Sequence, residues 1–123
     1  MRKLIRILFM MACLLLVGCG AASVQALKDS PGYHKTVISK HGYQESLKIV
    51  KDSYVELLSV DLSCTTYTDM KTGECSITGT YGITFFVSTK YLDDNSSRVD
   101  FYNVFDTSLV RDKIALISSR LTK

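Results

Sequence analysis

The sequence predicts a two-layer α+β domain, in which two helices cover one face of an antiparallel sheet of about four strands. Apolar residues recur every three or four positions in two segments, residues 43–58 and 109–121, as they do along one face of a helix. Between these segments, apolar and hydroxyl side chains alternate with the period of a strand. The resulting order is strand, helix, three strands, helix, which favours helices packed on one face of the sheet.

The first strand is expected at residues 34–40, which are β-branched at their centre, and the first helix follows a break at Gly42. Because this helix carries a single apolar stripe, we expect it to cover one face of the sheet. The stripe consists of Tyr43, Leu47, Val50, Tyr54, Leu57 and Leu58, and the charged residues opposite are Lys48, Lys51, Asp52 and Glu56.

A hairpin whose second strand is long is expected between residues 62 and 91. Thr72-Gly73 supplies the left-handed conformation that a hairpin loop often needs, with one cysteine on either side of the turn. From Ile77 to Tyr91, apolar residues alternate with Thr and Ser, which predicts one strand with an apolar face and a wet face. Gly79 and Gly82 indicate a bulge or a bend within it.

A turn at residues 93–97 precedes a last strand, residues 98–105, and a last helix capped by Asp106 or Thr107. The strand has apolar groups on both faces, which indicates either a central strand or an exposed contact surface. Val99, Phe101 and Phe105 lie on one side of the strand, and Tyr102 and Val104 on the other. The helix stripe consists of Val110, Ile114, Ile117 and Leu121, with Leu109 beside it.

The N-terminus carries the features of a secretory signal peptide. Three basic residues, Arg2, Lys3 and Arg6, precede eleven unbroken apolar residues from Ile7 to Val17. A basic end, an apolar run and small residues at the cut are the three parts of such a signal. The run falls short of the roughly 20 apolar residues of a spanning helix. A short N-terminal membrane anchor is the alternative interpretation.

Leu16, Val17, Gly18 and Cys19 resemble the lipobox of bacterial lipoproteins, in which Leu, a small or β-branched residue and Gly or Ala precede Cys. The resemblance covers residues 1–19. It implies that the signal peptide, residues 1–18, is removed and that Cys19 becomes an N-terminus carrying a diacylglycerol thioether and an N-acyl chain such as palmitate. Gly20 rather than Asp follows, which in enteric-type bacteria implies the inner leaflet of the outer membrane, facing the periplasm.

Residues 19–33 are predicted to be the lipidated N-terminus and a flexible tether, and residues 34–123 a single α+β domain. The tether segment is small and polar and contains the only proline, Pro31, in a Pro-Gly turn signal. When extended it would reach on the order of 40 Å, which would hold the domain clear of the lipid headgroups.

Composition limits the partners of the mature domain. Without the three basic residues of the signal peptide, twelve Lys and Arg balance twelve Asp and Glu. A nucleic-acid-binding domain shows a basic stripe, and this near-neutral chain shows none. We therefore expect no nucleic acid, and a membrane contact made through the acyl chains on Cys19.

Cys64 and Cys75 are expected to form a disulfide. Cys13 leaves with the signal peptide and Cys19 is acylated, so an even pair remains in an oxidising compartment. The loop that the bond closes has about a dozen residues and stabilises the fold by roughly 3 kcal/mol. A metal site is the alternative, but it needs further ligands, and His34 and His41 show no such spacing.

No catalytic residue, cofactor or metal site is assigned from the sequence. It contains no Gly-x-Ser-x-Gly motif, and the only adjacent carboxylates, Asp93 and Asp94, fall in a turn where Asp is common. Residues 79–82 lack the lysine of a phosphate-binding loop. His34 and His41 are interpreted as surface or strand-end histidines.

These observations predict a non-enzymatic lipoprotein that binds or scaffolds a protein of a cell-envelope complex. The candidate partner-binding residues are Tyr67, Met70 and Tyr102. One alternative is a small envelope enzyme acting on peptidoglycan or another glycan, whose carboxylates or histidine would converge in a cleft. A second is an inhibitor or exclusion lipoprotein that presents the loop of residues 66–74.

Overall fold

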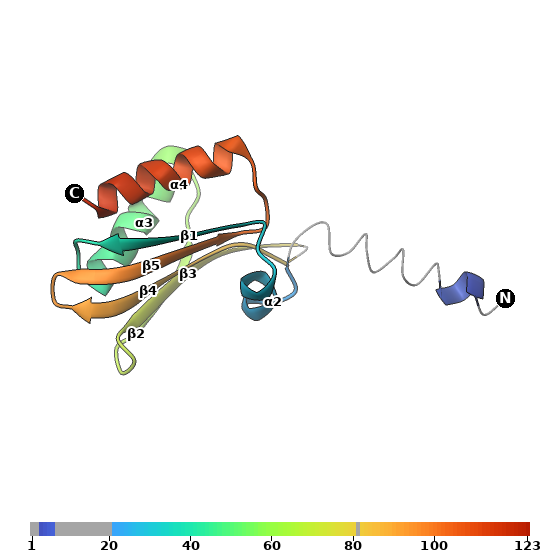
Figure 1. The fold of residues 1–123 in the computed structure, drawn as a ribbon, viewed down its shortest axis with the longest axis horizontal. Coiled ribbons are helices and arrows are strands. Elements are labelled where there is room, and N and C mark those ends of the chain that lie inside the picture. Colours follow the sequence, from blue (N-terminus) through green and yellow to red (C-terminus); the bar gives the residue numbers. More distant parts are fainter. Residues whose placement is uncertain (1–2, 7–20, 81) are drawn as a thin grey trace.

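The computed structural model describes residues 3–6, 21–80 and 82–123, and it confirms the predicted α+β class. Two long helices cover one face of an antiparallel sheet, and a short helix lies on the other face (Figure 1). The helices packed on the sheet are α2 (Val24–Asp29), α3 (Tyr43–Leu58) and α4 (Ser108–Leu121), and residues 3–6 form a separate helical turn. The strands are β1 (Tyr33–Ser39), β2 (Ser63–Tyr67), β3 (Thr72–Gly79), β4 (Gly82–Asp93) and β5 (Ser96–Asn103).

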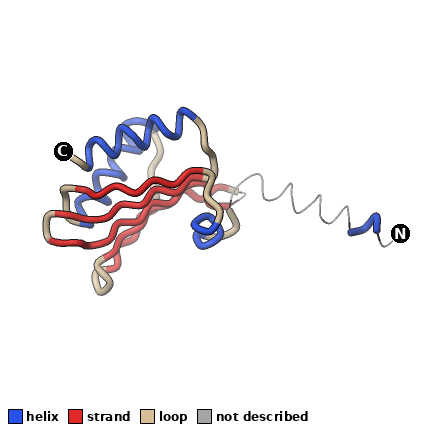
Figure 2. Tube along the Cα trace, in the orientation of Figure 1, coloured by secondary structure: helices blue, strands red, loops and turns tan. Residues whose placement is uncertain are grey.

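The sheet has five strands in the order β1-β5-β4-β3-β2, and each neighbouring pair is antiparallel. Strands β2 to β5 follow one another along the sheet, and β1 completes it beside β5 (Figure 2). The two edges are therefore β1 and the five-residue β2. The sheet order places β4 at the centre, with β5 between it and the edge strand β1.

The fifth strand arises where the sequence predicted one long strand. β3 ends at Gly79 and β4 begins at Gly82, and these two residues pair with each other across a hairpin. Gly82 has a φ of 122°, a conformation that side-chain-bearing residues rarely adopt. A two-residue connection pairs odd with even positions, as in Gly79 with Gly82, and the register shift beside it restores the parity, because Ile77 pairs with Phe85. Odd-numbered apolar residues therefore face the core on both strands, so the sequence shows no break in the alternation. The expected bend is thus a full reversal, next to a register shift after Ile77.

The predicted role of Thr72-Gly73 in the β2–β3 turn is wrong. The left-handed residue of that turn is Lys71, with a φ of 51°, whereas Gly73 lies inside β3 and pairs with Thr89. A Cβ atom on Gly73 would stand 2.9 Å from Leu47 Cδ2 and 3.0 Å from Thr89 Oγ1. The glycine therefore serves the close approach of α3 to the sheet.

The predicted disulfide between Cys64 and Cys75 is present. The two cysteines are register partners in β2 and β3, with their Cα atoms 4.1 Å apart. Cys75 is buried in the core on the helix side of the sheet. The bond therefore fixes the edge strand β2 to the sheet.

The core lies between the sheet and the predicted helix stripes. Tyr54 of α3 packs on Phe85 of β4 with ring centroids 4.6 Å apart, and burial raises the pKa of its hydroxyl far above the ordinary value. Thr107 caps α4, accepting from Val110 N at 3.2 Å. Two apolar residues of the expected last strand and helix lie outside the core: Phe105 is 48% exposed because β5 ends at Asn103, and Leu109 is 62% exposed.

Part of the predicted tether is folded against the sheet. Ala21 exchanges two backbone hydrogen bonds with Ile83, of 3.0 and 2.9 Å. Ser23 caps α2, and Leu27 of that helix is 1% exposed. Residues 21–29 are therefore docked on the sheet rather than free. The predicted signal peptide and Cys19 lie outside the described residues, except for residues 3–6.

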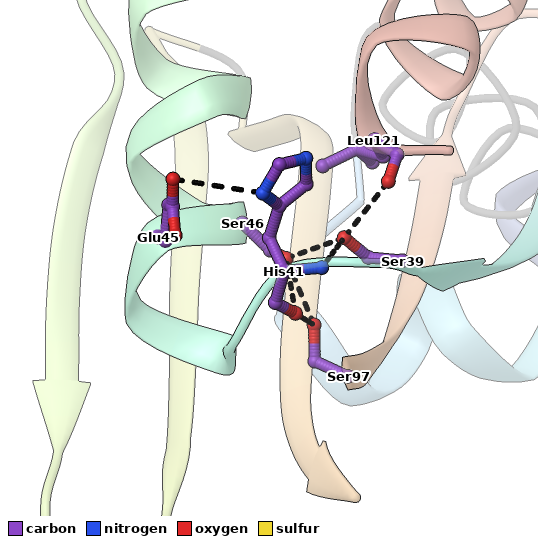
Figure 3. A network of polar contacts seen from close by, with 6 residues as sticks. All are labelled: Ser39, His41, Glu45, Ser46, Ser97 and Leu121. Atoms are coloured by element: carbon purple, nitrogen blue, oxygen red, sulfur yellow. Dashed lines mark hydrogen bonds and ion pairs between the residues drawn. The ribbon is translucent and has the colours of Figure 1, made fainter. Parts of the chain in front are cut away.

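A buried hydroxyl network joins β1, α3 and the end of α4 to β5 (Figure 3). Ser46 Oγ lies 2.7 Å from Ser39 Oγ and 2.8 Å from Ser97 Oγ, and it also donates to the carbonyl of His41. Ser39 Oγ in turn donates to the carbonyl of Leu121 at the end of α4. The network thus satisfies its buried hydroxyls with one another and with main-chain carbonyls, and it holds four elements at one corner.

Candidate partner-binding face

The face of the sheet turned away from α3 and α4, here called the open face, carries a hollow lined by charged and aromatic side chains. Phe85 and Val87 of β4 point into the core, so the alternate residues Phe86, Ser88 and Lys90 point to the open face. The register aligns three rows of open-face side chains across the sheet. They are Tyr67-Thr72-Lys90-Arg98-Ile38, Thr65-Glu74-Ser88-Asp100-Thr36, and Ser63-Ser76-Phe86-Tyr102-His34.

A shallow hollow of about 310 Å³ lies on the open face. Helix α2 forms one wall through Lys28, whose Nζ lies 5.0 Å from the centre of the Phe86 ring. The β2–β3 hairpin contributes Tyr67 and Met70. The remaining polar lining comes from the central strands and consists of Thr72, Glu74, Ser88, Thr89, Lys90, Arg98 and Asp100.

The structure brings the three predicted partner-binding residues onto this one face. Tyr67 and Met70 line the hollow and are 41% and 67% exposed. Tyr102 pairs with Phe86, which lines the hollow, and it stacks on His34 with ring centroids 4.3 Å apart and planes 4° from parallel. Burial raises the pKa of Tyr102, and the nearby Asp100 carboxylate adds to the rise.

Asp100 organises the polar side chains next to the hollow. Its carboxylate accepts from Thr36 Oγ1 at 2.5 Å and from Arg98 Nε at 3.0 Å, and it lies 3.2 Å from His34 Nε2. Burial pushes its pKa upward, but the hydrogen bonds from Thr36 and His34 and the charge of Arg98 outweigh that effect. The pKa of Asp100 is held below its usual value, so the carboxylate is ionised at neutral pH.

Tyr67 is oriented by a neighbouring strand. Its hydroxyl donates to Glu74 Oε1 at 3.0 Å, and this bond to a carboxylate raises the pKa of the phenol. The ring thus stands at the rim of the hollow with its hydroxyl engaged and its side available for contact. Met70, at the tip of the turn, adds a flexible apolar group beside it.

The contacts of His41 and Asp93 differ from those of a catalytic acid or base. His41 Nδ1 faces Glu45 Oε1 at 3.5 Å rather than a serine, as Figure 3 shows. Asp93 caps its own turn, and hydrogen bonds from Ser96 and Asn95 lower its pKa, whereas a general acid needs a raised one. In the described part of the chain, no three His, Cys, Asp or Glu side chains gather as metal ligands.

Sequence reasoning missed most residues of the hollow. Lys28 was assigned to the tether, and Glu74, Lys90, Arg98 and Asp100 were not singled out. The only sequence signal for these four strand residues is their place in the alternation, because each lies at a position whose side chain points to the wet face. Neighbouring strands must be in register before these sites form rows, and a single strand does not reveal that register.

The mixture of groups on the open face suits recognition of a protein. Lys, Arg and carboxylate groups alternate beside an exposed Tyr and Met, and aromatic, Met and Arg side chains are enriched in protein interfaces. Comparison of the chain with protein-family models and with curated proteins finds no match. Among the described residues, no helix is both long enough and apolar enough to cross a bilayer.

Proposed function

We propose that this protein is a lipid-anchored lipoprotein of the cell envelope that binds a partner protein through the open face. The observation that carries the proposal is a sheet face left uncovered by the long helices, on which an exposed tyrosine and methionine border a charged hollow. The lipobox resemblance at Cys19 supports the anchor, and with it a position on the periplasmic side of the outer membrane.

The open face favours a partner with a small apolar group framed by acidic and basic side chains. Met70 and Tyr67 offer apolar contact at the rim, while Lys90 and Arg98 on one side and Glu74 on the other offer charges of both signs. Charges of both signs select a partner by complementarity rather than by net charge. Because Tyr67 and Met70 come from a hairpin fixed by the disulfide, the backbone that carries them is held in place before the partner arrives.

Site-specific photo-crosslinking in intact cells tests the proposal. A photoreactive residue at Met70 is compared with one at Leu116, which is 49% exposed on α4, on the other side of the molecule. We expect a discrete protein adduct from position 70 and none from position 116. The adduct should weaken at least about tenfold in a Lys90→Glu variant, since a reversed charge in the interface opposes the partner.

Two results would contradict binding through the open face. Adducts of equal yield from positions 70 and 116, or a yield from position 70 that Lys90→Glu leaves unchanged, would show that contact does not depend on the hollow. Circular dichroism and an intact Cys64–Cys75 bond in each variant establish that the fold is retained.

A further inference from the structure

We infer that the end of the sheet next to Cys19 rests on the bilayer, with Phe105 and Leu109 in contact with lipid. This inference rests on the proposed lipidation of Cys19 and adds to it an orientation and a second contact surface. The surface, here called the anchor end, comprises Ala21, Ile83, Val104, Phe105 and Leu109. Its partner is the lipid of the anchoring membrane.

The first step is the short distance between the acyl chains and the fold. Both the backbone N–H and the carbonyl of Ala21 are hydrogen-bonded to the backbone of Ile83 at the start of β4. Cys19 precedes Ala21 by two residues, and two residues span at most about 7 Å. The lipidated cysteine therefore cannot lie farther than this from the sheet. A free tether over residues 19–33 would have allowed on the order of 40 Å.

The second step is the group of apolar side chains at this end. Val104 N donates to the carbonyl of Thr84 at 3.0 Å, next to the Ile83 that holds Ala21, so the β5–α4 connection leaves the sheet at the anchor end. Figure 1 shows this connection and α2 at the same end of the sheet. Phe105 is 48% exposed and Leu109 62% exposed, and both line a mostly apolar hollow of about 200 Å³.

Scattered apolar residues are ordinary on a protein surface, so exposure alone would not indicate a membrane contact. The position of these side chains near the acylated residue is the additional argument for a membrane contact. The headgroup layer on each side of a bilayer is about 5–7 Å deep, comparable with the reach from Cys19 to Ala21. Side chains at the anchor end are therefore held at the depth where apolar groups enter the interface. Lys113 lines the same hollow and can direct its ammonium to lipid phosphate.

The orientation also determines how the open face is presented. β3 runs from Thr72 to Gly79 and β4 from Gly82 to Asp93, and the 79–82 reversal lies at the anchor end. The turn carrying Met70 and the turn after Asp93 therefore lie at the far end of the sheet. The strands stand away from the membrane, and the hairpin with Met70 projects toward the periplasm.

Quenching of a single tryptophan by bromolipid tests the contact, because the chain contains no Trp of its own. The full lipidated protein carrying Phe105→Trp is reconstituted into vesicles with and without brominated phospholipid acyl chains. Leu92→Trp is the matched control, since Leu92 is 49% exposed at the far end of β4. We expect at least about threefold quenching at position 105 and almost none at position 92, as for a side chain within the interface.

Each other outcome overturns the inference. Equal quenching at both positions would mean that the domain tumbles on its anchor, and stronger quenching at position 92 would mean the opposite orientation. Protection of the indole in Phe105→Trp from iodide, without bromolipid quenching, would identify a second protein copy as the cover. Intact mass of the same samples separates the two proposals. A lipidated protein without quenching refutes only the contact of the anchor end with the bilayer. An unlipidated protein refutes the lipidation of Cys19 as well.

Discussion

Replacement of Leu27 by alanine should release α2 and Ala21 from the sheet while leaving the rest of the fold intact. Leu27 is 1% exposed and is the one buried side chain of a six-residue helix. A helix of this length is unstable alone, so its docking depends on this contact and on the Ala21–Ile83 hydrogen bonds. Truncation of a buried leucine costs about 2–5 kcal/mol.

The lower end of that range is appropriate here, because a surface helix can readjust more easily than the core. A loss of about 2 kcal/mol corresponds to roughly thirtyfold faster exchange of the amides that open with α2. Hydrogen–deuterium exchange should show this increase at Ala21 and Leu27, whose amides bond to Ile83 and Ser23 carbonyls. The thermal midpoint of the sheet should fall by only a few degrees.

Leu92→Ala provides the control, since Leu92 is half-exposed at the other end of the sheet. It should leave exchange at Ala21 unchanged. Unaltered exchange at Ala21 in Leu27→Ala would refute the conclusion that Leu27 holds this segment. A fall in the thermal midpoint by about ten degrees or more, on the scale of a core truncation, would instead place α2 within the cooperative core.

Three further perturbations test the contacts of the fold. Reduction of Cys64–Cys75 should lower stability by roughly 3 kcal/mol, measured by urea unfolding with and without reductant. Asp100 has a lowered pKa in the folded state, so its stabilising effect is present above about pH 4 and is lost as pH falls through the lowered value. Asp100→Asn should therefore narrow the difference between the free energies of unfolding at pH 7 and pH 3. An unchanged difference would exclude Asp100 as a cause of the pH dependence. Ser46→Ala removes the hub of the buried hydroxyl network and should cost about 1–3 kcal/mol, whereas Ser119→Ala, on an exposed position, should cost almost nothing.

The helices and the disulfide were predictable because their signals are local or compositional. Leu47, Val50 and Tyr54 recur at helical spacing because one face of α3 must be buried, and the structure buries them. The cysteine pair followed from counting the cysteines left after processing. In both cases the physical requirement is visible within a short stretch of sequence.

The misses involve contacts between distant segments or signals too short to recognise. Helix α2 has six residues and one buried side chain, too few to form a stripe. The 79–82 reversal keeps the alternation of the strand only because a register shift after Ile77 accompanies it. The Asp100 cluster joins Thr36 to a carboxylate 64 positions away, so only the pairing of β1 with β5 brings them together. The open face accordingly became a site only once the register was known.

Intact-mass analysis of the protein purified from its native membrane tests the lipid anchor most directly. The proposed processing predicts a chain that begins at Cys19 and carries the added mass of a diacylglycerol thioether and an N-acyl chain. A chain that retains Met1, or one that begins at Cys19 without lipid, would contradict the anchor. The inferred contact of the anchor end with the bilayer would then be refuted as well.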